Sequence, residues 1–241
     1  QEQMKAEAEK ERMRGNLLRA VSHDLRTPLT SIYGACSAMR DNFDALPRQT
    51  HMKLLSDVCA DAQWLVRMVE NLLSVTRVDA ATVRLSKNGT VLEELIDAVL
   101  VKFRKHYPDI DVHVEIPEEF VSIPMDAMLI SQVLMNLLEN AVFHAKGMEN
   151  LRLRVEVKGS WAYFYVEDDG CGIPEEKLSR LFTGMLDSEA PTDQSRSSMG
   201  IGLSVCSAII KAHGGEIWAN KRAGGGTEVG FRLEMEDENG E

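Results

Sequence analysis

The sequence lacks the signatures of several common protein classes. Its four cysteines include no CxxC pair, which argues against a disulfide framework or a cysteine-rich zinc site and fits a reducing compartment. No apolar run is long enough to cross a bilayer, and no stretch has the pattern of a secretory signal peptide. Basic residues are also scarce, with 27 Lys and Arg against 38 Asp and Glu, so we expect no nucleic-acid partner.

What is present is the composition of an ordinary soluble protein. Hydrophobic residues make up 44% of the 241 positions and charged residues 27%. That length accommodates one large domain or two modest ones. The opening residues, Gln1 to Arg12, are charged helix formers without an N-cap, which indicates a helix cut from a longer protein. We expect any membrane spans to lie in the missing N-terminal part.

The first third of the chain is predicted to form a helical hairpin. One helix spans residues 1–41, a break follows at residues 42–47, and a second helix spans residues 49–79. Apolar residues recur every three or four positions, which places one stripe of each helix against a partner. The hairpin alone leaves apolar surface uncovered, so we expect it to pair into a dimeric four-helix bundle. The stripe residues are Leu18, Val21, Leu25, Pro28, Ile32, Ala35 and Met39 in the first helix, and Val58, Leu65, Met68, Leu72 and Val75 in the second.

The periodicity changes near residue 85, which predicts two domains, 1–84 and 85–241. Runs that alternate apolar and polar residues indicate strands. Strands of this kind mixed with helices favour an α+β fold with the helices on one face of the sheet. We expect helices over residues 91–105, 127–145, 174–181 and 200–213, and strands over 110–116, 121–124, 151–157, 161–167, 216–220 and 227–234.

His23 falls outside the apolar stripe of the first helix and is expected to face solvent beside Asp24. An outward imidazole next to a carboxylate can accept a group from a visiting substrate. Pro28 lacks an N–H and should loosen the helix just after the histidine. Taken alone, a surface histidine on a bundle helix is the more common explanation of this pattern.

Two asparagines share a face of the helix expected over residues 127–145, because Asn136 and Asn140 are four positions apart. Asparagine is a poor residue for a helix interior, so two on a mostly apolar face need a reason. An amide oxygen is a hard ligand that suits a Mg²⁺ ion also bound to phosphate. The alternative is a pair of structural asparagines bonded to nearby backbone.

A second candidate lies at the end of the strand predicted over residues 161–167. Asp168 can accept a hydrogen bond from an amine such as that of adenine. Gly170 and Gly172 permit either a tight turn or a close approach of backbone to a flat ligand. An ordinary turn between a strand and a helix has the same pattern.

Two more glycine-rich stretches follow. Gly200 and Gly202 open a helix that continues through Leu203, and N–H groups at a helix start favour an anion. That stretch is neither a P-loop nor a dinucleotide-binding fingerprint, and a flexible hinge also explains it. Three glycines at 224–226 precede the last strand, and a turn accounts for them fully.

In this order and spacing, Ser22 to Leu29, Asn136 to Ala141 and Asp168 to Pro174 resemble the sensor histidine kinases of bacterial two-component systems. The resemblance covers residues 10–235, and around His23 and Met199 it is similar to the potassium-responsive sensors of the KdpD type. It implies a dimeric helical hairpin followed by a Bergerat-type α/β sandwich that binds ATP. It also implies that this chain is the cytoplasmic portion of a membrane-anchored sensor.

The resemblance assigns a role to each motif. It makes His23 the phosphoacceptor for the γ-phosphate of ATP, Asp24 its general base, and Thr27 the residue that positions water when a response regulator is dephosphorylated. The receiver domain of that regulator takes the phosphoryl group on an aspartate. The residues at 183–198 form the ATP lid. The resemblance also implies a nucleotide site, in which Asn140 is the Mg²⁺ ligand and Asp168 accepts a hydrogen bond from the adenine amine. The other residues of that site are Asn136, Gly170, Gly172, Gly200, Gly202 and Leu203.

Some positions depart from the family pattern. Phe143 and His144 stand where a basic and an aromatic residue are usual, so Mg²⁺, Lys146 or Arg196 must neutralise the phosphates. Residues 185 and 198 are Met and Ser where a second aromatic residue and a lid glycine are usual.

Two other functions are compatible with the same residues. The first is an ATPase of the chaperone or gyrase kind, which would need a catalytic glutamate where Asn136 stands. The second is a kinase-like scaffold without catalysis, which the missing basic residue at position 143 favours.

Overall fold

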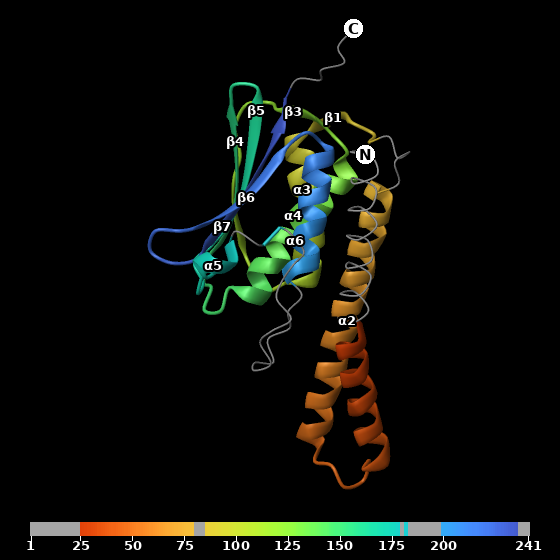
Figure 1. The fold of residues 1–241 in the computed structure, drawn as a ribbon. Helices are drawn as coiled ribbons and strands as arrows, with labels where there is room; N and C mark the ends of the chain where they lie inside the picture. The colour runs from red at the N-terminus through yellow and green to blue at the C-terminus, as the bar shows by residue number, and fades with distance from the viewer. Residues whose placement is uncertain (1–24, 80–84, 179–180, 183–198, 236–241) are drawn as a thin grey trace. The chain divides into compact units, whose positions relative to one another are not determined.

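The computed structural model describes residues 25–79, 85–178, 181–182 and 199–235 (Figure 1). The chain divides into two compact units, one containing a helical hairpin up to Leu73 and the other beginning at Ser74 and containing the β-sheets. Within the described ranges, no helix has an apolar stretch of the length that a bilayer requires.

The hairpin consists of a helix described over residues 25–41 and of α2 (Arg48–Asp79). Between them the N–H groups of Ala45 and Leu46 donate to the carbonyl of Asn42 at 3.0 and 3.1 Å, which closes the turn. The predicted stripe of the first helix is confirmed over its described part, because Leu25, Ile32, Ala35 and Met39 are half-buried and Pro28 is buried. The helical assignment continues through Pro28.

A second apolar stripe of α2 is exposed. It is displaced by one position from the stripe that is buried in the hairpin, and its residues are also three and four positions apart. A single hairpin therefore covers only one of the two apolar faces of this helix. The exposed stripe consists of Met52, Leu55, Cys59, Ala62, Val66 and Val69.

The second unit is built on a five-stranded sheet in the order β2-β4-β5-β7-β6. Only the β2–β4 pair is parallel; the other neighbours are antiparallel. A smaller antiparallel pair joins β1 to β3, and β1 is a strand that the periodicity did not predict. The strands are β1 (Asn88–Val91), β2 (Val112–Glu115), β3 (Ser122–Met125), β4 (Leu151–Lys158), β5 (Trp161–Asp168), β6 (Glu216–Lys221) and β7 (Thr227–Glu234).

Three helices lie on one face of the larger sheet (Figure 1). They are α3 (Leu92–His106), α4 (Ala127–His144) and α6 (Met199–Ala212), and a short α5 (Glu175–Leu178) follows the loop after β5. The predicted α+β fold with helices on one face is therefore confirmed.

Strand alternation separates the two faces of the sheet. Along β5, Ala162, Phe164 and Val166 are buried on the helix side, and Phe164 stacks on Phe231 of β7 with ring centres 4.6 Å apart. The alternate residues point to the opposite face, where Tyr163 and Tyr165 stack at 6.4 Å. This period of two decides on which side each residue at the end of β5 lies.

Candidate functional site

The two asparagines lie on α4, half of whose residues are buried. Asp126 caps the start of this helix by accepting the N–H of Leu129 at 3.2 Å. Asn136 is only 8% exposed, and the side-chain nitrogens of Asn136 and Asn140 are buried without a hydrogen-bond partner among the described residues. A buried amide without a partner is costly, so both side chains are suited to a ligand.

Asp168 ends β5 on the helix side of the sheet and is 6% exposed. Its Oδ1 accepts the N–H of Gly170 at 2.9 Å and the N–H of Thr227 at 3.3 Å. Burial raises the pKa of this carboxyl group, and the two N–H donors and the nearby Arg222 oppose the rise. Asp168 is therefore a buried carboxylate with one oxygen occupied by backbone.

The loop after Asp168 packs against the end of α4. A Cβ atom added to Gly170 would lie 2.6 Å from the Cβ of Ala145, so only glycine fits this approach. The N–H of Cys171 donates to the carbonyl of Lys146 at 3.0 Å. The structure thus brings this loop to the end of the helix that carries Asn140, one turn beyond that residue.

The glycine turn before β7 belongs to the same region, which the sequence did not indicate. Gly226 has a φ of +88°, and a Cβ there would lie 2.0 Å from the carbonyl oxygen of Asp168. Arg222, at the start of the turn, donates through Nη1 to that oxygen at 2.8 Å. The only signal in the sequence was three consecutive glycines followed by a threonine at a strand start.

Asp169 anchors the loop on its other side. Its carboxylate accepts the N–H groups of Glu149 and Asn150 at 2.8 and 2.9 Å and the side-chain amide of Asn150 at 2.6 Å. These donors lower the pKa of Asp169 to about 2. The two adjacent carboxylates thus have different surroundings. Asp169 joins the loop to the segment before β4, while Asp168 lies on the face of the sheet that the helices cover.

Gly200 and Gly202 lie in the first turn of α6 and Leu203 begins the next turn, so the predicted helix is confirmed here. Leu203 is 1% exposed and belongs to the interior. One turn later the thiol of Cys206 lies 3.9 Å from the carbonyl of Val133 and beside Asn136, and burial raises its pKa to about 12. These contacts place α6 alongside the asparagine face of α4.

The structure does not describe several of the predicted residues. His23, Asp24 and the lid at 183–198, with Met185 and Arg196, lie outside the described residues. Thr27 is exposed on the hairpin helix.

One of the departures, at position 143, has a local explanation. Phe143 packs edge-on against Tyr107 with ring centres 6.0 Å apart, and the hydroxyl of Tyr107 donates to Glu139 at 3.2 Å. An aromatic residue at position 143 therefore has a packing role. Lys146 is exposed at the edge of the loop, where its main chain is bonded to Cys171.

The residues brought together suit a nucleotide and a hard cation. Amide oxygens on α4 are ligands of the kind that Mg²⁺ prefers, and an ionised Asp168 can accept a hydrogen bond from an amine. Gly170 and Gly226 allow backbone segments to approach one another closely around Asp168. The buried amide nitrogens of Asn136 and Asn140, which lack partners among the described residues, are donors that suit acceptor oxygens such as those of a phosphate group.

Comparisons with known proteins identify two regions. Residues 13–81 match the family described as His Kinase A (phospho-acceptor) domain. Residues 125–237 match the family described as histidine kinase-, DNA gyrase B-, and HSP90-like ATPase. The glycine turn before β7 and both asparagines fall within the second match.

Among curated proteins, the chain is 35% identical over 237 residues to the sensor protein KdpD of Clostridium acetobutylicum, which covers 98% of this chain and 26% of that protein. It is 32% identical over 230 residues to the sensor protein KdpD of Escherichia coli, covering 94% of this chain and 25% of that protein. The chain thus spans about a quarter of the length of these relatives.

Solved structures share the fold. The histidine kinase ThkA, in its complex with the response regulator protein TrrA, has a TM-score of 0.74 at 24% identity, covering 99% of this chain and 66% of that chain. The Acinetobacter baumannii histidine kinase AdeS has a TM-score of 0.65 at 24% identity, covering 89% and 98%. At these identities the likeness establishes the fold alone.

Proposed function

Because this chain belongs to the sensor histidine kinases, we propose that it transfers the γ-phosphate of ATP to His23 and then to an aspartate of a response regulator. The observation that carries this proposal is the pair of buried asparagine amide nitrogens on α4, the helix whose end meets the loop after Asp168. The phosphoacceptor comes from residues 1–84 and the nucleotide site from residues 85–241.

Each side chain has a part in the reaction. Asp168 accepts a hydrogen bond from the adenine amine, and Asn136 and Asn140 face the phosphate side. When bound, Mg²⁺ held by Asn140 neutralises charge on the phosphate oxygens. Asp24 takes the proton from one ring nitrogen of His23, while the other nitrogen attacks the γ-phosphorus in line and the bond to ADP breaks.

The same chain is proposed to dephosphorylate the regulator. Thr27 follows Asp24 by three positions in the sequence and is exposed, so its hydroxyl is available to orient a water molecule. The regulator would dock on the hairpin, because Thr27 lies on its first described helix and His23 precedes Thr27 by four positions in the sequence. Phosphoimidazole is a reactive donor, which suits onward transfer to a carboxylate.

The acceptor is tested by incubating the chain with γ-labelled ATP and Mg²⁺. We expect an adduct that is labile in acid and stable in base, and complete loss of label in His23→Gln. His113→Gln is the matched control, because His113 is an exposed histidine on β2 whose side chain is 68% exposed. It should label as the unaltered chain does.

Other results would select another function. Label that persists in His23→Gln would reject this residue as acceptor. Steady hydrolysis of ATP without labelled protein would favour an ATPase of the gyrase kind, and absence of ATP binding would favour a scaffold.

A further inference from the structure

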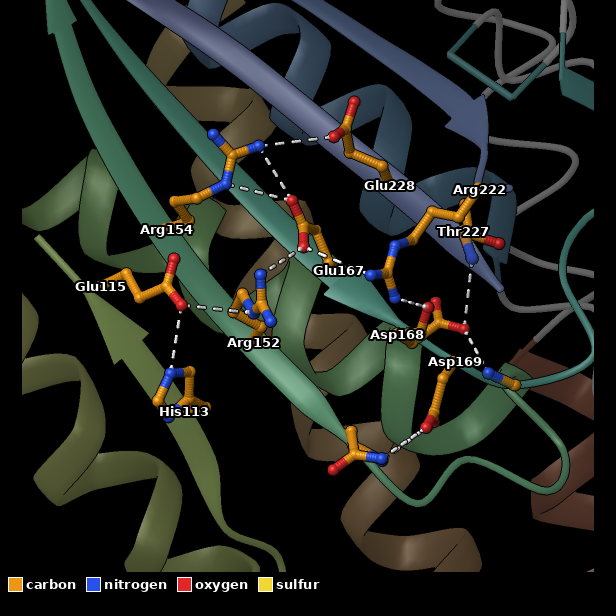
Figure 2. Close-up of polar contacts among 12 residues, drawn as sticks. His113, Glu115, Arg152, Arg154, Glu167, Asp168, Asp169, Arg222, Thr227 and Glu228 are labelled. Carbon is orange, nitrogen blue, oxygen red and sulfur yellow. Dashed lines mark hydrogen bonds and ion pairs between the residues drawn. The ribbon is translucent and has the colours of Figure 1, made fainter. Parts of the chain in front are cut away.

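Glu167 is a buried carboxylate on the face of the sheet opposite the helices. It is 5% exposed, next to Asp168 in sequence but on the other side of β5. Three arginines surround it: Arg154 donates to Oε1 through Nε and Nη2 at 3.2 and 2.9 Å, and Arg152 and Arg222 each lie 3.7 Å from Oε2 (Figure 2). A buried charge of this kind depends on such partners.

Arg222 connects this carboxylate to the candidate nucleotide site. Its Nη2 faces Glu167, while its Nη1 donates to the carbonyl oxygen of Asp168 at 2.8 Å. Its backbone N–H also donates to the carbonyl of Gly226 at 3.2 Å. The planar guanidinium can serve both oxygens at once, which a lysine ammonium on its flexible stem cannot do as well.

The arrangement leaves one oxygen of Asp168 for a ligand. The main chain of Asp168 is held by Arg222, and Oδ1 is held by the N–H groups of Gly170 and Thr227. The other oxygen, Oδ2, has no hydrogen bond to any described residue. The charge of Arg222 also favours the ionised carboxylate, because it opposes the rise in the pKa of Asp168 that burial causes.

We propose that Arg222, held in place by Glu167, is a positioning residue that aims Asp168 at the exocyclic amine of a bound adenine. The inference rests on the proposed function and extends it to two residues outside the asparagine and glycine motifs. Arg222 touches the backbone of Asp168 on the side away from the helices. It therefore acts through Asp168 rather than by contact with the base.

The test compares two nucleotides that differ only in the amine. ATP and purine riboside triphosphate, which lacks the exocyclic amine, are titrated with Mg²⁺ into the chain by calorimetry. We expect the unaltered chain to bind ATP about tenfold more tightly, since a hydrogen bond to a charged group has that magnitude. In Arg222→Met that preference should largely disappear, with ATP affinity lowered and analogue affinity within about twofold of the unaltered chain.

Two further variants sharpen the result. Glu167→Gln removes the charge that holds Arg222 and keeps its shape, so it should lose part of the same preference. Arg232→Met is the matched control, because Arg232 also lies on this face, over the ring of Trp161 at 4.5 Å and 2.9 Å from Glu216, and has no described contact with Asp168. It should retain the full preference.

The outcomes are distinct. If Arg222→Met weakens both nucleotides equally, Arg222 is a structural residue and the inference is wrong, as it is if neither affinity changes. If the unaltered chain binds both nucleotides equally, Asp168 does not recognise the amine and the inference fails while ATP binding stands. If the unaltered chain binds neither, the proposed function fails and the inference fails with it.

Discussion

Gly170 occupies a position where no side chain can be accommodated. An added Cβ would lie within 2.6 to 2.8 Å of the side chain and backbone of Ala145. The backbone of α4 and the loop after β5 would have to separate, and that loop carries Asp168. At the scale of a residue, the absence of a side chain at Gly170 therefore allows the loop after β5 to lie close to the end of α4.

We predict that Gly170→Ala lowers the free energy of unfolding by about 1–3 kcal/mol, the usual cost of overpacking. Urea unfolding followed by circular dichroism measures the change. Gly34→Ala is the contrasting variant, because Gly34 lies in a helix with no atom within 4 Å of an added Cβ. It should raise that free energy by about 0.5–1 kcal/mol. Equal stability of Gly170→Ala and the unaltered chain would contradict the close approach.

At the scale of elements, a buried histidine connects two helices. His213 follows α6 and is 4% exposed; its Nδ1 donates to the carbonyl of Ile209 at 2.8 Å, and its Nε2 accepts the N–H of Asp126 at 3.1 Å. Asp126 is the N-cap of α4. Lys87 donates to the carbonyl of His213 at 3.1 Å. This pattern requires a neutral ring, because a protonated Nε2 cannot accept a hydrogen bond.

We predict that, because of this ring, the free energy of unfolding decreases as the pH is lowered. Burial lowers the pKa of His213 below its ordinary 6.5, so the unfolded chain binds the proton first. The contribution is complete above about pH 7 and is lost as the pH falls below 6.5 toward the lowered pKa, at up to about 1.4 kcal/mol per pH unit. Urea unfolding between pH 5 and about 8 measures the slope.

A conservative variant isolates this ring from other groups. Burial also lowers the pKa of His144, which acts in the same direction. In His213→Gln the amide oxygen can take the place of Nε2, so the slope should become shallower. An identical slope in His213→Gln would show that the ring is not responsible.

At the scale of the whole molecule, the exposed apolar stripe of α2 indicates association. Met52 is 60% exposed, Leu55 47% and Val66 59%, and they repeat with the spacing of a coiled-coil seam. Exposed apolar surface of this regularity marks an interaction site. A second copy of the hairpin would cover it, in agreement with the expected four-helix bundle.

We predict that the chain is a dimer and that Val66→Glu weakens its association by about a hundredfold, because the new charge would be buried at the seam. Sedimentation velocity over a range of concentrations measures this. Lys53→Glu introduces the same group at an exposed position outside the stripe and should leave the dimer intact. A monomer at all concentrations in the unaltered chain would reject the pairing.

Much of the fold could be predicted because its signals are local. The periods of 3.6 and 2 in the sequence gave α4, α6, the β4–β5 hairpin and β7 nearly to the residue. The strand β1 was missed because its four residues, Asn88 to Val91, carry no alternation and are stabilised by pairing with β3 some 34 positions away, as in Thr90 with Ile123. Strand order was also not predicted.

Some residues of the candidate site could likewise be predicted from local patterns, and others could not. The shared face of Asn136 and Asn140 follows from helical spacing, and the position of Asp168 at a strand end follows from alternation, so both could be read locally. The turn at 224–226 could not, since its glycines are explained by any turn. Its role depends on the approach of Gly226 to the carbonyl of Asp168.

The sequence by itself determined most of the helices and strands, the shared face of Asn136 and Asn140, and the family to which the chain is similar. Only the tertiary structure decided that Arg222 reaches Asp168, that Gly170 meets Ala145, and that His213 bonds to Asp126. The physical reason is the separation along the sequence over which each interaction acts. Periodicity and turn chemistry act between neighbours, whereas these contacts join residues 25 to 87 positions apart and exist only once the sheet and helices have packed.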